Sequence, residues 1–452
     1  MWSLRMNKLQ FTNGNPSIVI PLYILTACLL GLMIPFQPML MAVVITGFMA
    51  LLGSILYPER MSYVLCISTV ISIQYIAPFT MMGFDFQSVH KIGILILLLP
   101  AMIHYGIHRK LTMPIIALLG LLTITFLFSD RHPLLTMSAP VVAFVGLAIP
   151  FVFLIIRWKP SVARQHIIII CFMPLLSIAF GTLFHLLSIH PLFVMEFTGA
   201  FRLQGANIPA HLGFLAFIAL LVSIMEIKRN PQRMTFFYMM MGINFVILLL
   251  TGTRGPLISA LIIIIVFFYD LSRQFVEGRV NRIFPLFGFV VVLALSIIWQ
   301  LENFRKRTFV RSTDEFIDTS GRLEAWTYFL DGVKESPWFG RGLGSVLVSN
   351  DGSLYQGFVV PHNEYIRFYY DSGIIGAILL FLSLLFVFRQ VFIRLHSDHK
   401  LYFIAFIMGF LVYTISDNTL STLQFIVPFC MYLSALRNLN DHPISKEVIR
   451  YG

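Results

Sequence analysis

The sequence predicts an all-α, polytopic membrane protein with about 12–14 transmembrane helices and one large, partly helical extracytoplasmic loop. Of the 452 residues, 58% are hydrophobic and only 12% are charged, and the mean hydropathy is +0.84. Soluble domains carry roughly 25% charged residues. About fourteen apolar runs recur along the chain, and they are continuous rather than alternating. Continuous runs indicate helices, which satisfy their own backbone polar groups inside lipid.

Each apolar run is a candidate membrane helix. The runs lie at residues 18–36, 38–56, 61–84, 92–107, 113–128, 134–156, 166–189, 208–226, 235–251, 255–270, 283–301, 373–388, 401–416 and 420–436. Some are shorter than the ~20 residues that a full span needs, so two of them could be re-entrant. The first run follows Arg5 and Lys8 without a small-residue cleavage site, and it predicts a retained helix rather than a removed signal peptide.

The same pattern divides the chain into six parts. We expect a cytoplasmic N-terminus (1–17), N-terminal transmembrane helices (18–200), a transmembrane core with Arg-bearing outer loops (201–301), a large extracytoplasmic loop that holds the catalytic residues (302–372), C-terminal transmembrane helices (373–436) and a cytoplasmic tail (437–452).

Basic residues predict the orientation. With the N-terminus in the cytoplasm, 20 of the 32 Lys and Arg residues fall on the inner side and 4 in the short outer loops. The remaining 8 lie in the long polar segment, and long translocated regions are largely exempt from the charge rule. Both termini are therefore expected in the cytoplasm. The net charge of +11 is then explained by inner anchoring residues rather than by a nucleic-acid partner.

The cysteine pattern argues against metal and disulfide chemistry. All four cysteines lie inside apolar runs and none shows CxxC spacing, which is typical of small hydrophobic residues in helices.

Arginines in the outer loops are the first candidates for chemistry. Arg254 lies in TGTRGPL, a tight reversal that leads into the next helix, and Arg202 lies in AFRLQGANIPAH. Helix N-termini and guanidinium groups both favour phosphate. The alternative for Arg254 is an interfacial arginine that reaches toward lipid headgroups.

The long polar segment adds two more arginines. SGRLEAWTYFLDGVKE has apolar residues at helical spacing, so Arg322 falls in the first turn of a helix, where a cation opposes the helix dipole unless an anion binds. The alternative is a solvated surface arginine. PWFGRGLG, which contains Trp338 and Arg341, suggests a glycine loop whose backbone approaches something closely, or else a plain tight loop.

The string PHNEYIRFYYD supplies a candidate base. With Pro361 at a first helical position, His362, Tyr365 and Tyr369 would share one helix face. The dipole at a helix N-terminus favours a neutral imidazole, which is what a general base requires, although a lone histidine is more often structural. Asp417 and Asn418, in a short outer loop, could support such a site without touching substrate.

Four motifs in this order resemble the O-antigen ligase/polymerase superfamily of bacterial membrane glycosyltransferases. They are TGTRGPL (251–257), GRLEAW (321–326), PWFGRGLG (337–344) and PHNEYIRFYYDSGIIG (361–376), and RLQGANIPAH (202–211) resembles an earlier family element. The resemblance covers roughly residues 200–435. TGTRGPL departs mildly from the Ser-Arg-Gly of many relatives but keeps the Arg-Gly pair.

The resemblance implies a polytopic enzyme of the bacterial cytoplasmic membrane that needs no cofactor, metal or nucleotide. Its partners would be an undecaprenyl-diphosphate-linked glycan, an acceptor glycan, the lipid bilayer and a chain-length regulator. The essential arginines of the family would fall on Arg254 and Arg322 and its essential histidine on His362.

The remaining candidates would bind substrate around these three residues. Arg202 and Arg341 would assist with the diphosphate, whereas Trp338, Asn363, Tyr365 and Tyr369 would contact the sugars. Stabilising the charge on a diphosphate leaving group suits arginine, and deprotonating a hydroxyl suits histidine.

Three functions remain open from the sequence. Fourteen runs exceed the twelve usual for ligases in this superfamily, which favours a polysaccharide polymerase (O-antigen, capsule or exopolysaccharide). A ligase acting on lipid A-core or protein is the alternative within the class. A polysaccharide-precursor transporter or flippase is the alternative from another class, but it should place charges at mid-membrane, where this sequence has few.

Overall fold

The computed structural model describes residues 38–76, 80–81, 84–135, 138–196, 199–278, 321–349 and 360–440, with residue 31 and single positions between 287 and 305. The chain divides into two compact units, Met1–Tyr57 and Pro58–Gly452. The first contributes one described helix, α2 (Pro38–Leu56), whose sequence contains no charged residue.

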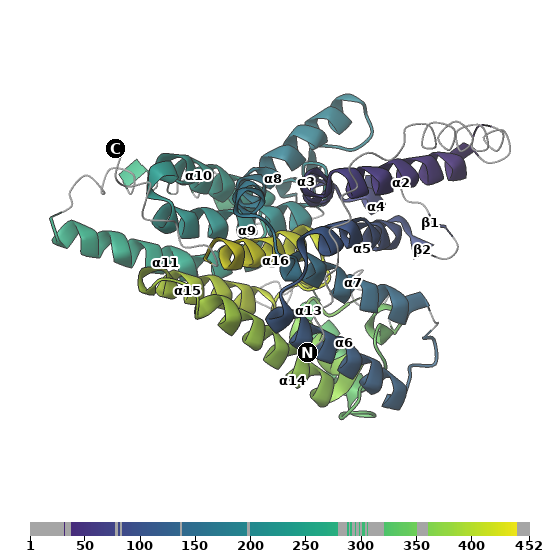
Figure 1. Ribbon diagram of the computed structural model, residues 1–452. Coiled ribbons are helices and arrows are strands. Elements are labelled where there is room, and N and C mark those ends of the chain that lie inside the picture. Colours follow the sequence, from purple (N-terminus) through teal and green to yellow (C-terminus); the bar gives the residue numbers. More distant parts are fainter. Residues whose placement is uncertain are drawn as a thin grey trace, which may run out of the picture. The chain divides into compact units, whose positions relative to one another are not determined.

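The second unit is almost entirely helical (Figure 1). Its helices are α3 (Pro58–Ser68), α4 (Ile73–Ile76), α5 (Phe86–Tyr105), α6 (Arg109–Phe128), α7 (Ser138–Ile155), α8 (Pro160–Leu186), α9 (Pro209–Arg229), α10 (Met234–Thr251), α11 (Arg254–Val276), α13 (Arg322–Val333), α14 (Glu364–Phe392), α15 (Ser397–Tyr413) and α16 (Leu423–Asn440). Two antiparallel hairpins, β1 (Thr80–Met81) with β2 (Phe84–Asp85) and β3 (Phe193–Met195) with β4 (Phe201–Leu203), and the short 3-10 turns η1 (Pro231–Arg233) and η3 (Ser345–Leu347) complete the described elements.

The predicted fold class, an all-α polytopic membrane protein, is confirmed. Seven helices among the described residues are long and apolar enough to cross a membrane, and shorter apolar helices lie at Ile45–Leu56, Ala139–Ile155 and Leu423–Leu439. The apolar run 18–36 falls almost wholly outside the described residues, and 283–301 is described only at single positions. The count of twelve to fourteen spans therefore stays a prediction.

Helix α9 forms the centre of the second unit. In its most apolar window 94% of the residues are buried, whereas the other six long helices reach at most 50%. Helices α8, α10, α11, α15 and α16 pack around α9. A helix that is apolar all round is expected in such a buried position.

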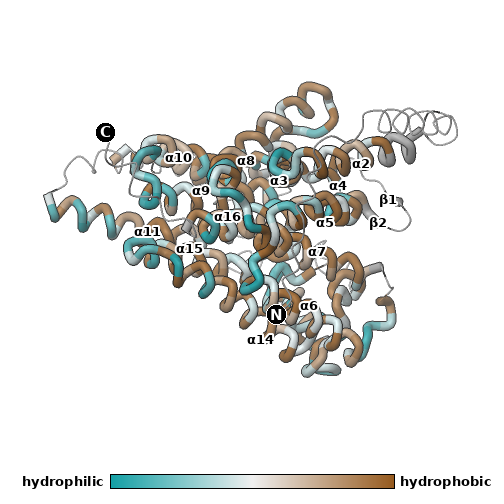
Figure 2. Tube along the Cα trace, viewed as in Figure 1, coloured by the Kyte–Doolittle hydropathy of each residue, from teal (hydrophilic) through white to brown (hydrophobic). Residues whose placement is uncertain are grey.

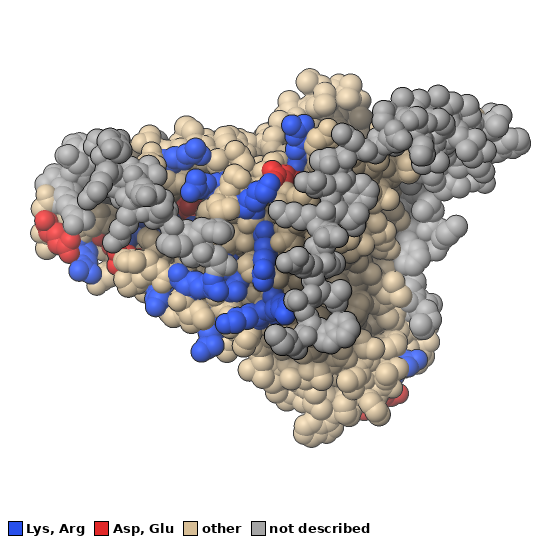
Figure 3. All heavy atoms as spheres, in the orientation of Figure 1, with Lys and Arg blue, Asp and Glu red and all other residues tan. Residues whose placement is uncertain are grey.

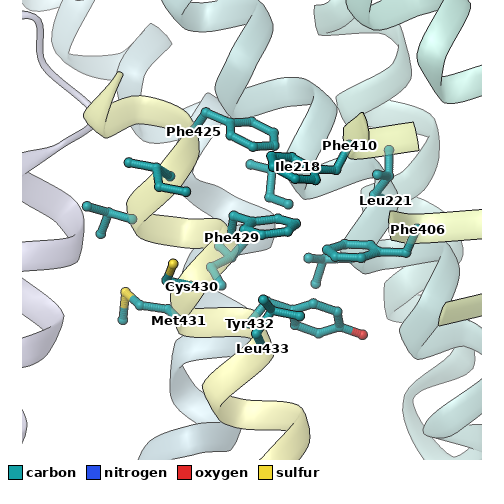
Figure 4. Packing of buried hydrophobic residues seen from close by; sticks show 14 of the residues in the cluster. Ile218, Leu221, Phe406, Phe410, Phe425, Phe429, Cys430, Met431, Tyr432 and Leu433 are labelled. Carbon is teal, nitrogen blue, oxygen red and sulfur yellow. The ribbon is translucent and has the colours of Figure 1, made fainter. Parts of the chain in front are cut away.

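Stacked aromatic rings join α15 and α16 beside α9. Phe410 and Phe429 lie 4.5 Å apart between ring centroids, and Phe406 and Phe429 are almost parallel at 5.5 Å. Figure 4 shows these rings together with Ile218 of α9. Their offset stacking adds to the free energy gained by removing apolar surface from contact with water or lipid.

Hydrophobic residues run along the lengths of the outer helices, whereas hydrophilic residues gather at helix ends and connections (Figure 2). Large apolar side chains are exposed on these helices, including Ile103, Met113 and Ile265. In a membrane protein such exposed apolar surface faces lipid, so its exposure carries no penalty.

Helix α14 is broken at Gly373, which has φ 66° and ψ −175°. The break separates a polar first segment from the long apolar segment that follows, at the position where the sequence predicts a span to begin. The Pro337–Gly344 loop lies directly against the break, because a Cβ on Gly373 would overlap the carbonyl group of Trp338. The predicted close approach of this glycine loop is therefore an approach to the backbone of α14.

Candidate functional site

His362 lies immediately before α14 rather than inside it. Its φ is 46°, in the left-handed region, which few non-glycine residues adopt. Asn363 is the N-cap, and its side-chain oxygen accepts hydrogen bonds from the backbone N–H groups of Tyr365 (3.0 Å) and Ile366 (3.2 Å). The predicted helix start at Pro361 is wrong, because Asn363 caps the helix two residues later. His362 consequently does not share a helix face with Tyr365.

The His362 ring is paired with Asp417. Its Nδ1 lies 3.0 Å from Oδ1 of Asp417, in the turn between α15 and α16. A carboxylate can only accept this hydrogen bond, so Nδ1 is the nitrogen that donates it. Burial raises the pKa of Asp417, but the hydrogen bond from His362 and the charges of His362 and Arg322 outweigh it. The pKa of Asp417 is thus held below its ordinary value of 3.8.

The start of α14 is fastened to the α15–α16 region by further hydrogen bonds. The Glu364 N–H donates to the Thr414 carbonyl (2.9 Å), and the Glu364 carboxylate accepts from the Leu420 N–H (2.6 Å). The Tyr365 hydroxyl donates to the Leu411 carbonyl at 3.0 Å. The Glu364 charge is itself paired with the buried Arg367 at 2.9 Å. The His362–Asp417 pair therefore lies at a junction where several hydrogen bonds hold the start of α14 against the α15–α16 region.

Arg322 is the first residue of α13 and its charge acts on Asp417. Its Nε is buried and has no hydrogen-bond partner among the residues that the structure describes. Leaving a buried donor unsatisfied is costly, so this nitrogen is available to an incoming acceptor. Four residues on, Trp326 donates from Nε1 to the carbonyl of Pro361 (2.7 Å), which holds α13 against the residue before His362.

Arg254 begins α11, after Gly252 has reversed the chain in the left-handed conformation. Gly255 packs against the end of α15, where an added Cβ would overlap the Ser416 hydroxyl. Because Ser416 adjoins Asp417, the Arg-Gly turn lies beside the segment that carries the His362 partner.

Arg202, on β4, holds the turn that contains Arg254 in place. Its Nε donates to the Thr251 carbonyl at 2.6 Å, and its guanidinium is paired with Glu196. The charges of Arg202, Arg322 and Asp417 all act on Tyr413 at the end of α15. The structure thus brings Arg202, Arg322 and the Arg254 turn to the segment next to His362.

Three other predicted substrate contacts have partners away from the His362–Asp417 pair. Arg341 pairs with Asp130 (3.0 Å) and with Glu335, on the opposite face of α13. Trp338 is exposed on the loop that packs at Gly373. Tyr369 packs with the small apolar cluster of Phe329, Val333, Val346 and Tyr370.

Asn363 and Tyr365 have structural partners. Asn363 is buried and caps α14, while the Tyr365 ring stacks on Phe381 with centroids 4.6 Å apart. Their predicted sugar contacts therefore compete with contacts that already hold the start of α14.

Sequence reasoning gave no role to His211, which lies in the first turn of α9. Its Nδ1 is 2.7 Å from the Ser72 hydroxyl, and it lies within electrostatic range of His362 and Asp417. The sequence signal for it is a histidine near the N-terminal end of an apolar helix, inside RLQGANIPAH. No group of three or more His, Cys, Asp or Glu side chains in the described ranges could hold a metal ion.

Comparison with known families places this geometry in context. Residues 239–381 match the family model described as O-antigen ligase, and a search of curated proteins found no match. The matched region contains Arg254, Arg322, Arg341 and His362, whereas Asp417 lies beyond it. The match confirms that this part of the chain resembles the O-antigen ligase/polymerase superfamily, whose members are multi-pass, glycosyltransferase-like membrane enzymes.

Proposed function

We propose that this relative of the O-antigen ligases is a polysaccharide polymerase. It would transfer glycan from an undecaprenyl-diphosphate carrier to an acceptor sugar hydroxyl at the outer face of the bacterial cytoplasmic membrane. The observation that carries the proposal is the His362–Asp417 pair at 3.0 Å with the Arg322 charge beside it. A base held by a carboxylate and an unsatisfied guanidinium nitrogen are the two groups that this reaction needs.

The transfer would proceed in one displacement. Nε2 of His362 takes the proton of the acceptor hydroxyl while its oxygen attacks the anomeric carbon of the donor. The bond between that carbon and the diphosphate oxygen breaks, and its electron pair leaves with the diphosphate. Arg322 and Arg254 bind the leaving diphosphate, and Asp417 stabilises the imidazolium that forms.

The other residues would have supporting roles. Arg202 holds the Arg254 turn through the Thr251 carbonyl. The diphosphate is a good leaving group that is already anionic, so stabilising its charge matters more than protonating it.

A ligase is the second candidate, because the matched family is described as O-antigen ligase. The two differ only in the acceptor: a polymerase uses the growing glycan or a new repeat unit, whereas a ligase uses lipid A-core or a protein. The chemistry at His362 would be the same in both.

The test uses the purified full-length protein in lipid nanodiscs with lipid-linked repeat units alone. We expect wild-type protein to form polymers, and His362→Ala to reduce the rate by about 10²–10⁴-fold. His396→Ala is the matched control, because His396 is an exposed histidine in the α14–α15 connection. Products that form only after lipid A-core or protein is added identify a ligase. Normal elongation by His362→Ala would refute the proposed mechanism.

A further inference from the structure

A cavity of about 690 Å³ lies along α13. It is lined by Glu324, Thr327, Asp331 and Glu335 and by His132 and Arg341, the last of which is paired with Glu335. Ligand pockets typically have volumes of about 300–1,000 Å³. The proposed transfer reaction makes no use of this cavity.

The cavity and the His362 site use opposite faces of α13. The cavity residues repeat every three or four positions and so share one face. On the opposite face, Phe329 and Val333 are buried and Trp326 is bonded to Pro361 beside His362. The same helix therefore contributes Arg322 to one site and a polar wall to the other.

The charges of the cavity do not suit a diphosphate. Three carboxylates line it against one guanidinium, that of Arg341, which is already paired with Glu335 and Asp130. An added polyanion would be repelled at this range. The expected assistance of Arg341 to the diphosphate is therefore not favoured. The carboxylates do not converge on a metal site either, as judged over the described residues.

The same groups suit uncharged hydroxyls. Carboxylates accept strong hydrogen bonds from hydroxyl groups, and Arg341 can donate them. Burial and the Arg341 charge lower the pKa of His132, which favours the neutral ring. Because its Nδ1 accepts from the Leu134 N–H at 3.3 Å, the other ring nitrogen is left to donate to a hydroxyl.

Tyr328, which is partly exposed, provides an aromatic wall for the apolar face of a sugar ring, and the buried Tyr370 packs beneath the cavity. The Tyr328 hydroxyl donates to the Ser349 carbonyl at 2.6 Å, which fixes the ring at the edge of the cavity. Tyr370 packs edge-on against Phe329, with centroids 5.1 Å apart. A rigid ring with a satisfied hydroxyl, such as that of Tyr328, presents a contact surface at low entropic cost.

We propose that this cavity is a second glycan site, which binds an uncharged stretch of the polysaccharide while transfer takes place at His362. It rests on the proposed function only for the source of the glycan, because binding does not require the reaction. A chain held on one face of α13 stays near the reactive face through successive additions, so the site would favour long products.

The test measures binding of two probes to the full-length protein in nanodiscs by saturation-transfer NMR and calorimetry. The first is neutral oligosaccharide cut from the polysaccharide of the source cells, and the second is inorganic pyrophosphate. We expect the double variant Glu324→Gln, Glu335→Gln to weaken oligosaccharide binding by about 10-fold or more, because charge-assisted hydrogen bonds are lost. Pyrophosphate binding should not weaken in this variant, whereas Arg322→Ala should reduce only pyrophosphate binding.

Glu277→Gln is the matched control, since Glu277 is also an exposed glutamate paired with an arginine, Arg273, at 2.9 Å. It should bind both probes as the wild-type protein does. Equal oligosaccharide affinity in the wild-type protein and the double variant, or no oligosaccharide binding to either, would overturn the second site. If the wild-type protein does not bind pyrophosphate, that result would instead count against the proposed function.

Discussion

At the residue scale, the hydrogen bond between His362 and Asp417 fixes the orientation of the imidazole ring. The left-handed conformation of His362 turns its ring away from the helix that follows, toward the α15–α16 turn. An unusual backbone conformation of this kind is often found where a side chain must be aimed at a reaction.

Asp417→Asn should lower kcat by about 10-fold to 10²-fold with little change in KM. This fall is smaller than the effect of removing the general base itself, because the imidazole remains. The amide can present its NH₂ group to Nδ1, which favours the wrong tautomer, and it cannot stabilise the imidazolium. Initial rates with lipid-linked repeat units would measure this effect. An unchanged kcat would mean that Asp417 has only a structural role.

The depressed pKa of Asp417 also predicts a pH dependence of stability. A carboxyl group whose folded-state pKa lies below its unfolded value stabilises the fold above that unfolded value, and the stabilisation is lost as pH falls through the folded pKa. Thermal unfolding in nanodiscs between pH 6 and pH 3 should therefore show a smaller loss for Asp417→Asn than for the wild-type protein. Parallel curves for the two proteins would contradict this expectation.

The sequence identified His362, Arg254 and Arg322 as candidates because residue type and loop position carry that information. It also named Asp417 as a residue that could support the site, but it could not show that His362, 55 residues away, is its direct partner, because tertiary packing brings the two together. Nor could it show that Arg341 pairs with Asp130, 211 residues earlier.

At the scale of the element, the break in α14 joins the polar segment before it to a long apolar helix. The Arg341 N–H donates to the Tyr370 carbonyl (2.8 Å) and the Ile374 N–H to the Pro337 carbonyl (2.9 Å), on either side of Gly373. One carbonyl and one N–H group at the break thus find partners in the loop, as any interruption of a helix at a membrane boundary requires.

Gly373→Ala should destabilise the protein by about 1–3 kcal/mol, because φ of 66° is unfavourable for alanine and its Cβ would overlap the Trp338 carbonyl. Gly242→Ala in α10 is the matched control, since a Cβ there meets nothing within 4 Å and alanine favours helix. Thermal unfolding of both variants tests the difference. Equal midpoints for the two variants would show that the break tolerates a side chain.

The sequence predicted the α13 helix and the span beginning near residue 373, because apolar periodicity and glycine positions are local signals. It placed the start of α14 at Pro361 because proline suits a first helical turn. The helix begins after Asn363 instead, because the Asn363 side chain caps it. The presence of a proline does not indicate these capping hydrogen bonds.

At the scale of the whole molecule, the predicted orientation remains the main expectation. Lys and Arg predominate over Asp and Glu on the face seen in Figure 3. An excess of basic residues on one side is typical of the cytoplasmic surface of a membrane protein.

Single cysteines would test the orientation in intact cells with a membrane-impermeant maleimide. Lys334→Cys, at an exposed position after α13, should be labelled from outside. Asp398→Cys, exposed at the start of α15, should be labelled only after the membrane is permeabilised. The described native cysteines are buried, so the background should be low. The reverse labelling pattern would overturn the expected orientation of the active site.

The junction between α14 and the α15–α16 turn has a consequence for how substrate preference can change. The groups that would transfer the proton are held in place by backbone and side-chain links before any sugar arrives. If the proposed glycan site exists, substitutions on the face of α13 that carries Glu324 and Asp331 should change which glycan it binds while the His362–Asp417 pair keeps its alignment.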